Sequence, residues 1–264
     1  MRQLELTQRW KERRTSFRPA GEVIDTQAYD VAPIAGDGVA KAFVVKHHYA
    51  GSYPAARWRF GLYRAGELQG VAVFSHPCND AVLTSVFPGQ ASDSVELGRF
   101  VLLDEVPSNG ETWFLGRAFE LLRREGLRGV VSFADPLPRH RQDGTCITPG
   151  HVGTVYAAHN GVYLGRGTAR TLRLLPNGTT FSDRAAQKVR RREQGWRYAV
   201  GLLVDAGASA PAAGEELGEW LKRALSSLAS VRHPGNHKYA WPLQRRERRW
   251  LPTSLPYPKR WVSG

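Results

Sequence analysis

Residues 94–136 constrain the fold more than any other part of the chain. They read as a strand, SVELGRFVLLD, a helix, TWFLGRAFELLRREG, and a buried strand, LRGVVSFADP. Apolar residues recur at helical spacing in the middle segment, and Gly126 closes it. The last strand must end at Pro136, because proline cannot continue a ladder. A strand, a crossover helix and a strand in this order predict an α/β fold.

Further elements follow from the hydrophobic pattern on either side. Alternation in the first strand predicts that Glu96, Gly98 and Phe100 lie on one face. FGLYRAGELQGVAVFSHP predicts a β-hairpin that turns at residues 65–67. GTVYAAHNG predicts a short helix, VYLG a strand, and TARTLRLL with TTF another hairpin. EWLKRALSSL predicts a helix after a low-complexity joint.

Composition narrows the class of protein. A chain of 264 residues with 42% hydrophobic residues can bury one sizeable core without disulfide staples. Its two cysteines are too few for a disulfide framework, which favours a reducing compartment. The N-terminus has no apolar signal segment, and no run is long enough to span a bilayer. We therefore expect a cytoplasmic protein without a membrane partner.

Positive charge is concentrated toward the C-terminus. The formal net charge is +13, and residues 184–260 hold 16 Lys and Arg against 6 Asp and Glu, which is +10 of that total. The clusters KVRRREQGWR and LQRRERRW mix arginine with tryptophan. Arginine neutralises phosphates and indole rings stack on bases, so this mixture predicts a nucleic-acid partner. The alternative is an ordinary solvated helix face.

Several motifs in one order resemble a known family. HHYAGS at 47–52 is followed by ELGRFVLLDEVPSNGETWFLGRAFELL, then VVSFADP, then GTVYAAHNGVYLG. This series resembles the Mom family of phage DNA-modification proteins, which is similar in fold to the GNAT N-acyltransferases. The resemblance implies transfer of a carbamoylmethyl group to the N6 amine of adenine in double-stranded DNA, which protects phage DNA from restriction nucleases.

The resemblance completes the predicted architecture. We expect an N-terminal arm at 1–35 and a GNAT-like catalytic core at 36–182, with a mixed central sheet flanked by helices. A basic C-terminal helical extension, rich in Trp and Arg, is expected at 183–264. An acyl-coenzyme A donor is what the fold implies, although the glycine-spaced phosphate loop of that superfamily is missing here and an acidic residue opens the helix.

Five residues are the candidate catalytic groups. An exocyclic adenine amine is a poor nucleophile, so its reaction needs a base, an oriented electrophile and a donor that stabilises developing charge. His48 can serve as base or proton relay and Tyr49 as phenolic donor. Asp135 would orient the histidine or bind the amine, with Ser132 beside it. The fold resemblance implies that Tyr156 protonates a leaving group.

Each of these residues also has a structural interpretation. His48 and Tyr49 could be buried core residues, and Ser132 and Asp135 could cap a strand end. Tyr156 could pack in the core at helical spacing.

Other residues are expected around the donor and the base. Asn109 and Glu111 would shape the loop at the cofactor end, unless Asn109 only caps the helix. Arg99 is a candidate for substrate binding, with a structural ion pair to Glu96 as the alternative.

The C-terminal segment supplies candidates for gripping DNA and stacking on an extruded base. The aromatic candidates for the base are Trp196, Tyr239 and Trp241. The basic candidates for the phosphate backbone are Arg190, Arg191, Arg192, Lys238, Arg245 and Arg246. Trp241 could instead cover the core, and the arginines could serve solubility alone.

The segment from Leu137 to Val152 is longer than the family link we expect. It carries His140, Cys146 and His151, but their spacing matches no standard zinc pattern. A metal ion held by His48 and Asp135 stays open. Two other functions also stay open: a coenzyme A-dependent N-acyltransferase acting on a hypermodified base or another amine, and a non-catalytic DNA-binding protein.

Overall fold

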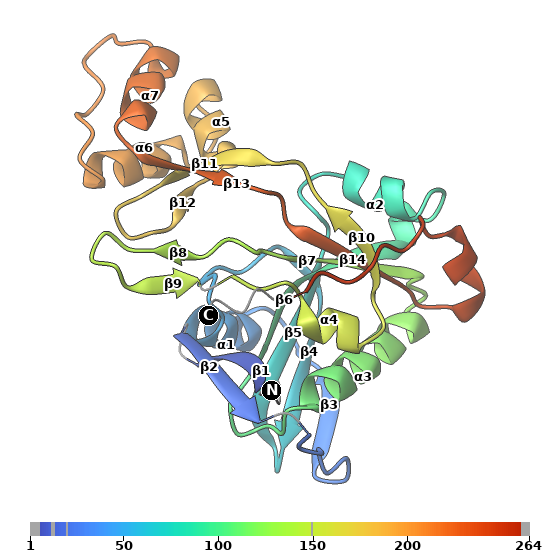
Figure 1. The fold of residues 1–264 in the computed structure, drawn as a ribbon. Helices are drawn as coiled ribbons and strands as arrows, with labels where there is room; N and C mark the ends of the chain where they lie inside the picture. The colour runs from blue at the N-terminus through green and yellow to red at the C-terminus, as the bar shows by residue number, and fades with distance from the viewer. Residues whose placement is uncertain (1–5, 12–13, 20, 149, 260–264) are drawn as a thin grey trace. The chain divides into compact units, whose positions relative to one another are not determined.

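The computed structural model describes residues 6–11, 14–19, 21–148 and 150–259. These residues divide into two compact units (Figure 1). Unit 1 comprises Met1–Pro136, Gly150–Gly167 and Asn236–Gly264, and unit 2 comprises Leu137–Pro149 and Thr168–Gly235. The long segment after Pro136 therefore belongs for the most part to unit 2, together with residues 168–235.

Unit 1 is built on a seven-stranded mixed sheet of order β10-β14-β7-β6-β5-β4-β3. Only β6 and β7 run parallel, and every other neighbouring pair is antiparallel. The predicted α/β class with a mixed central sheet is confirmed. The strands are β3 (Tyr29–Pro33), β4 (Ala56–Arg64), β5 (Glu67–Ser75), β6 (Ser94–Leu102), β7 (Gly129–Ala134), β10 (Val162–Arg166) and β14 (His237–Pro242).

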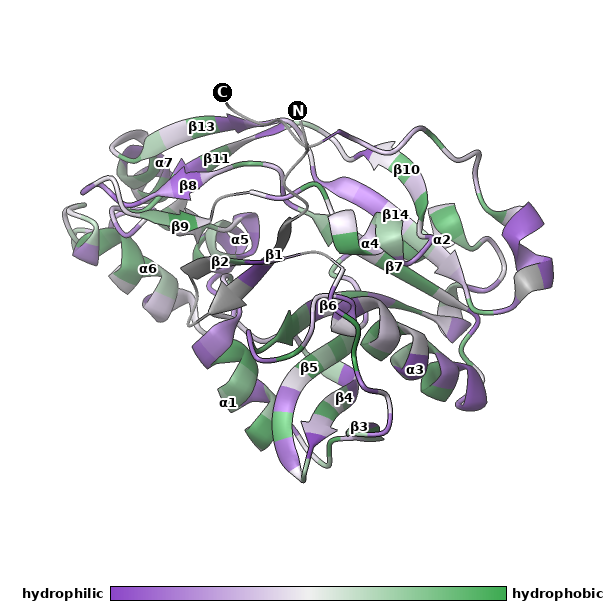
Figure 2. Cartoon of the chain, turned by 60° about the horizontal axis from the view of Figure 1, so that its bottom comes forward, coloured by the Kyte–Doolittle hydropathy of each residue, from purple (hydrophilic) through white to green (hydrophobic). Residues whose placement is uncertain are grey.

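Helices cover both faces of this sheet. On one face, α3 (Gly110–Arg124) and α4 (Thr154–Ala158) enclose the largest core cluster, which includes Phe74 and Phe114. On the other face, α1 (Gly38–His47) packs on Val71 and Val73, and α2 (Ala81–Val86) contributes to a cluster with Val131. Figure 2 shows α3 with alternating hydrophobic and hydrophilic colours, as a helix with one buried face requires.

Most local predictions in the core are confirmed. The hairpin is β4 with β5, the crossover helix is α3, and the strand that follows it is β7. The predicted short helix and strand are α4 and β10. The two helices α1 and α2 were not predicted, and two short 3-10 helices, η1 (Ala91–Asp93) and η2 (Arg245–Trp250), were also missed.

The predicted alternation of β6 is wrong beyond Leu97. Arg99 pairs with Val73 and Leu97 pairs with Phe74, so Gly98 is an extra residue that forms a bulge. Because the bulge reverses the alternation, Phe100 packs in the same cluster as Leu97, and Val101 packs in the cluster on the other face. Glu96 and Phe100 therefore do not share a face.

The N-terminal segment contains more regular structure than an irregular arm. β1 (Leu6–Lys11) and β2 (Arg14–Pro19) form an antiparallel hairpin, and β3 is the last strand of the central sheet. The side chain of Arg9 in this hairpin is buried.

The C-terminal segment is a helical extension only in part. Unit 2 has three helices, α5 (Asp183–Arg191), α6 (Trp196–Asp205) and α7 (Leu217–Ser226), packed around a core of its own that contains Trp220. Its strands form a sheet of order β12-β11-β13 and a two-stranded sheet of β8 with β9. Their bounds are β8 (Arg139–His140), β9 (Cys146–Thr148), β11 (Arg170–Leu174), β12 (Thr180–Phe181) and β13 (Ala229–His233). The chain then returns to unit 1, where β14 lies between β7 and β10.

Within the part of the chain that the structure describes, no helix has both the length and the apolar character needed to cross a bilayer.

Candidate active site

Polar side chains gather in unit 1 where the parallel pairing of β6 and β7 stops. The paired residues run from Ser94 with Gly129 to Leu97 with Ser132, and the Gly98 bulge follows at once. At this point the Ser132 hydroxyl donates to the Leu97 carbonyl oxygen at 3.0 Å. The two strands have no further ladder pairs there, so the site opens between their ends.

Arg99 is fixed at this site by the loop after α1. Its Nε donates to the Ser52 carbonyl at 2.9 Å, and its Nη2 donates to the Ser52 hydroxyl at 2.8 Å. Burial lowers the pKa of Arg99, while Tyr49 and Glu96 act in the opposite direction. The predicted ion pair with Glu96 is absent among the described contacts, because the guanidinium is directed to Ser52. Arg99 keeps its positive charge beside the other polar groups.

Glu96 is the group at this site that the sequence interpretation undervalued. No hydrogen bond or ion pair joins its carboxylate to any residue in the described part of the chain. Burial raises its pKa, and Arg99 partly opposes this shift. The charge of Glu96 also contributes to raising the pKa of Tyr156. A carboxylate without a partner and with a raised pKa is suited to accept a proton.

His48 ends α1 and is buried. The Ala50 backbone N–H donates to its Nδ1 at 3.1 Å, and the Tyr49 ring stacks on its ring with centroids 4.3 Å apart. Burial lowers the pKa of His48 well below its ordinary value, and Arg99 and His151 lower it further. Since Nδ1 accepts a hydrogen bond, the neutral ring carries its proton on Nε2. In this arrangement His48 is a hydrogen-bond donor rather than a base.

His151 joins the site although it was predicted only as an incidental residue of the long insert. Its Nε2 lies 3.3 Å from the Tyr49 hydroxyl, and its backbone N–H donates to the Asp135 carbonyl at 2.8 Å. Tyr49 and His151 are 102 positions apart in the sequence, so no local pattern could have predicted this contact. His140 and Cys146, the other two candidates in the insert, belong to unit 2 and are exposed.

Tyr156 on α4 is buried over the strand ends. Burial raises its pKa, and a hydrogen bond with Ser132 opposes that shift. Behind it, the Tyr239 ring lies 5.4 Å away and the Trp241 ring 5.5 Å away, centroid to centroid. The Tyr239 hydroxyl donates to the Val152 carbonyl at 2.5 Å, just before α4 begins. This aromatic wall holds Tyr156 in place.

The same contacts correct the role expected for Tyr239 and Trp241. Their exposed fractions are only 1% and 4%, and both rings belong to the main core cluster. They have no free face for an extruded base, and the core interpretation of Trp241 is confirmed.

The start of α3 does not fit the pyrophosphate of coenzyme A. Glu111, in its first turn, forms an ion pair with the buried Arg9 at 2.5 Å. Arg9 also donates to the carbonyl oxygens of Leu103, Val106 and Pro107. The Ser108 N–H donates to the Glu22 carboxylate. Carboxylates and a hairpin of the chain itself therefore lie where a phosphate group would need free N–H groups.

Asn109 and Glu111, predicted at the cofactor end, both have partners within the chain. The Asn109 Oδ1 accepts from the Ile24 N–H at 2.7 Å and makes no capping bond to the helix. Asn109 occupies the N-cap position of α3, but its side chain makes no capping hydrogen bond, so the interpretation of this side chain as a helix cap is wrong.

A metal site also lacks support in the described residues. Among them, no group of three or more His, Cys, Asp and Glu side chains is arranged to hold a metal ion. Asp135 has interactions of its own, and its carbonyl accepts from His151.

The predicted DNA-backbone residues are divided between the units. Arg190, Arg191 and Arg192 are exposed in unit 2, and Trp196 is half-buried there. In unit 1, Lys238 is half-buried and Arg246 is exposed, while the side chain of Arg245 lies outside the described residues.

Comparisons with solved structures found distant likenesses. A tandem GNAT protein from the clavulanic acid biosynthesis pathway, in a structure without AcCoA, is 11% identical with a TM-score of 0.42, over 82% of this chain and 99% of that one. An N-acetyltransferase from Staphylococcus aureus Mu50 is 9% identical with a TM-score of 0.36, over the same 82% and 99%. A Bacillus subtilis acetyltransferase in complex with CoA is 8% identical with a TM-score of 0.34, over 82% and 98%. Scores below 0.5 do not by themselves establish a common fold.

A comparison with curated protein sequences found no significant match. A family model gives the decisive result, because the model of the Mom protein family matches residues 28–259. That range includes every strand of the central sheet and every residue of the candidate active site. The chain belongs to the Mom protein family.

Proposed function

We propose that the protein is a DNA-modifying transferase that adds a small carbamoylmethyl-like or acyl-like group to an exocyclic base amine, with adenine N6 as the favoured target. Such a modification would protect DNA from restriction nucleases. Membership of the Mom family supports this function. The observation that carries it is the Glu96 carboxylate. Its pKa is raised, it makes no hydrogen bond or ion pair in the described part of the chain, and it interacts electrostatically with Arg99 and Tyr156.

The side chains present supply each proton that the transfer requires. The amine nitrogen forms a bond to an electrophilic carbon of the donor while the bond from that carbon to its leaving group breaks. Glu96 accepts the proton that the amine loses, and Tyr156, whose pKa is raised by burial, donates a proton to the leaving group. Transfer of that proton from Glu96 to the Tyr156 phenolate restores both side chains, so in net terms one proton moves from the amine to the leaving group.

Arg99 and His48 stabilise the charge that develops during this step. Arg99 is held by two hydrogen bonds to Ser52, so its cation is positioned before the substrate binds. His48 stays neutral because its pKa is lowered, and its Nε2–H is the proton that it can offer to an oxygen or nitrogen of the substrate. Asp135 has its own interactions and closes the edge of the site through His151.

Mass spectrometry of nucleosides tests this function directly. Bacterial cells would express the wild-type protein, Glu96→Gln, Asp135→Ala or the control Glu120→Gln, whose carboxylate is paired with Arg117 and Arg124 on α3. A new deoxyadenosine adduct with wild type and the control, but not with Glu96→Gln, is the expected result. Unmodified nucleosides in every sample, with soluble expression, would contradict plain adenine as the substrate.

A labelling experiment distinguishes the proposed function from the alternative, a coenzyme A-dependent N-acyltransferase. The GNAT resemblance favours it, but the occupied start of α3 disfavours it. Purified protein would be incubated with DNA or other amines and radiolabelled acetyl-coenzyme A. Transfer of label would establish the alternative. If the protein binds DNA without catalysis, the Glu96→Gln variant should protect DNA from restriction as well as the wild type does.

A further inference from the structure

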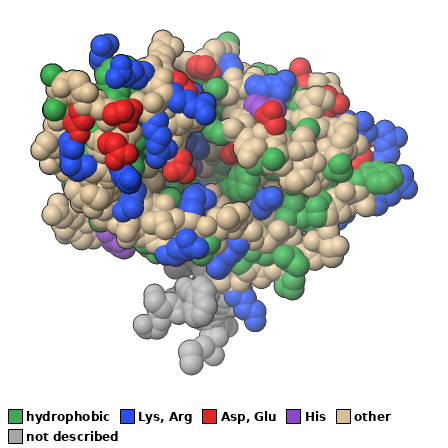
Figure 3. All heavy atoms as spheres, turned by 90° about the horizontal axis from the view of Figure 1, so that it is seen from above, with side chains coloured by type: hydrophobic (Ala, Val, Ile, Leu, Met, Phe, Trp, Pro, Cys, Tyr) green, Lys and Arg blue, Asp and Glu red, His purple; other side chains and the backbone are tan. Residues whose placement is uncertain are grey.

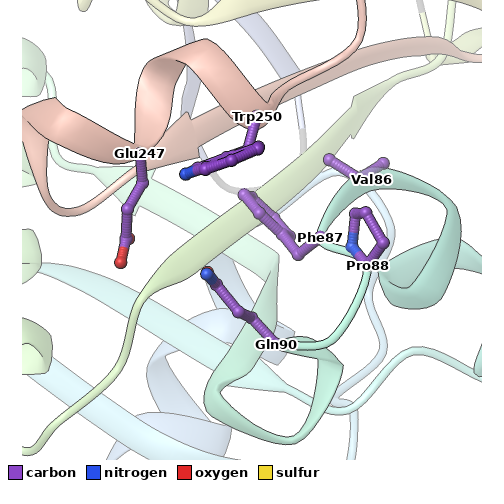
Figure 4. Close-up of a pocket in the computed structure, with 6 residues that line it drawn as sticks. All are labelled: Val86, Phe87, Pro88, Gln90, Glu247 and Trp250. Carbon is purple, nitrogen blue, oxygen red and sulfur yellow. The ribbon is translucent and has the colours of Figure 1, made fainter.

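A hollow beside α2 in unit 1 is not used by the proposed reaction. It has a volume of about 270 Å³ and is lined by Val86, Phe87, Pro88, Gln90, Glu247 and Trp250 (Figure 4). All six residues belong to unit 1. They come from the end of α2, the loop after it, and η2.

The hollow is distinct from the candidate active site. Phe87 lies beneath Gly129, where an added Cβ would stand 2.5 Å from the Phe87 ring. Gly129 begins β7, whereas Ser132 of the candidate active site lies three residues further along that strand, about 10 Å away at the rise of an extended chain. The cluster that contains Phe87 also packs on Val131, whose side chain points to the face opposite Ser132.

One wall of the hollow is an exposed aromatic ring. Trp250 is 62% exposed, and the Arg249 guanidinium lies 5.0 Å from the centroid of its ring. Figure 4 shows the Trp250 and Phe87 rings next to each other, with the Gln90 side chain extending into the region below them. An exposed indole backed by arginine is a stacking surface that any base can use.

The other wall supplies polar groups. Glu247 is buried and accepts from Arg128 through Oε1, but its Oε2 has no hydrogen-bond partner among the described residues. A buried acceptor without a partner is rare in native proteins and indicates a missing donor. The Gln90 side-chain amide can both donate and accept. A ligand with an amino group on a planar ring matches these groups.

Positive charge surrounds the entrance. Arg246, Arg248 and Arg249 of η2 are exposed, and Glu247, the acidic residue among them, is paired with Arg128. Figure 3 shows Lys and Arg side chains beside hydrophobic ones at the right edge, the side on which η2 lies in Figure 1. Phosphates complement this charge.

We infer that the hollow is a binding subsite for one unpaired nucleotide, whose base stacks on Trp250 and whose phosphate faces the η2 arginines. The base enters with an amino group directed to Glu247 and Gln90, so adenine and cytosine bind better than thymine. Duplex DNA offers no unstacked base to this surface, and single-stranded nucleic acid is therefore its partner. This inference goes beyond the proposed reaction and does not depend on it.

Fluorescence anisotropy with labelled single-stranded oligonucleotides tests the subsite. Trp250→Ala should weaken binding of oligo-dA by about 10-fold or more, the usual cost of losing one stacked base, and Trp250→Phe should restore most of the loss. The matched control is Tyr198→Ala. It removes an exposed aromatic ring of unit 2 that does not line the hollow. Wild type should bind oligo-dA and oligo-dC more tightly than oligo-dT.

Three results would overturn the inference: unchanged binding by Trp250→Ala, an equal loss in Tyr198→Ala, or no preference for bases with an amino group. Calorimetry with adenosine monophosphate distinguishes a free nucleotide from a strand. If Trp250→Ala loses binding of the mononucleotide but not of the oligonucleotide, a strand is not the partner. Glu120→Gln, the control variant on α3, should bind oligonucleotides as wild type does. The experiment measures binding alone, so a failed reaction does not affect its result.

Discussion

The start of α3 and the end of the β6–β7 pair are both places where this chain could hold a charged substrate, and they are treated in opposite ways. At α3, the Arg9 guanidinium is paired with the Glu111 carboxylate and donates to the Pro107 carbonyl, and the Glu22 carboxylate accepts from the Ser108 N–H. At the strand ends, Arg99 is held in place while Glu96 is left without a described partner.

The difference teaches which of the two regions carries chemistry. A buried ion pair whose hydrogen bonds are all made contributes to structure, and breaking it is costly. A half-buried acid without a partner, such as Glu96, has a shifted pKa, and such groups gather at functional sites. The predictions below test this division between a structural region and a reactive region.

The largest expected effect is on catalysis at Glu96. Glu96→Gln keeps the size of the side chain but removes the proton acceptor, so we expect the rate of base modification to fall by about 100- to 10,000-fold. Quantitative mass spectrometry of modified nucleosides over time would measure this rate. The melting temperature should stay at or above that of wild type, because the substitution removes a partly buried charge. A fall in the rate below 3-fold would contradict the role of Glu96.

The next effect is on stability at the start of α3. Arg9→Met leaves the Glu111 carboxylate buried without its cation, and the free energy of unfolding should fall by about 3–5 kcal/mol. Denaturant titration would measure it. The control, Arg117→Met, removes an exposed ion pair with Glu120 and should leave the free energy of unfolding nearly unchanged. Equal losses in the two variants would remove the contrast between the regions.

A smaller effect is expected at Tyr239, which links the core to the site. Tyr239→Phe removes the hydrogen bond to Val152 before α4, at a cost of about 0.5–1.5 kcal/mol. Because that bond positions Tyr156, the modification rate should also fall, by less than in Glu96→Gln. Tyr257→Phe, which loses a bond to the Gly161 carbonyl, is the matched control and should leave the rate unchanged. A rate loss in the control alone would show that Tyr239 does not position the site.

The smallest effect is a shift in the pH profile. Glu96 must be ionised to accept a proton, and burial raises its pKa, so the modification rate should rise with pH at a higher pH than for an ordinary glutamate. Arg99 opposes the shift, so Arg99→Gln should move this rise to still higher pH in whatever activity remains. Initial rates between pH 4 and pH 8 would measure both. A rise centred at the ordinary value near 4.5 would be inconsistent with Glu96 as a base whose pKa is raised.

The sequence predicted the elements that depend on local pattern. The hairpin of β4 and β5, the helix α3 and the strand β7 carry strong periodicity and clear end signals such as Gly126. The helix α1 was missed because apolar residues occur all around GVAKAFVVKH, so no single face is marked.

The candidate site was predicted less completely, because its contacts are not local. The motif HHYAGS located His48, Tyr49 and Ser52. The bulge at Gly98 could not be predicted, because the hydrophobic pattern of the sequence does not reveal the extra residue. Glu96 was assigned to Arg99 because the two are close in sequence, whereas Ser52 takes the guanidinium in the fold. His151 could not be placed, since its contact with Tyr49 depends on where the long insert returns to unit 1.

The position of β14 between β7 and β10 has a consequence for the order of folding. Its neighbours are complete long before it is synthesised, because residues 168–235 intervene. At the usual rates of translation, the edges of β7 and β10 stay unpaired for several seconds while the intervening unit emerges. During that interval the wall formed by Tyr239 and Trp241 is missing and Tyr156 has no support. The candidate active site is therefore incomplete until this late strand has left the ribosome.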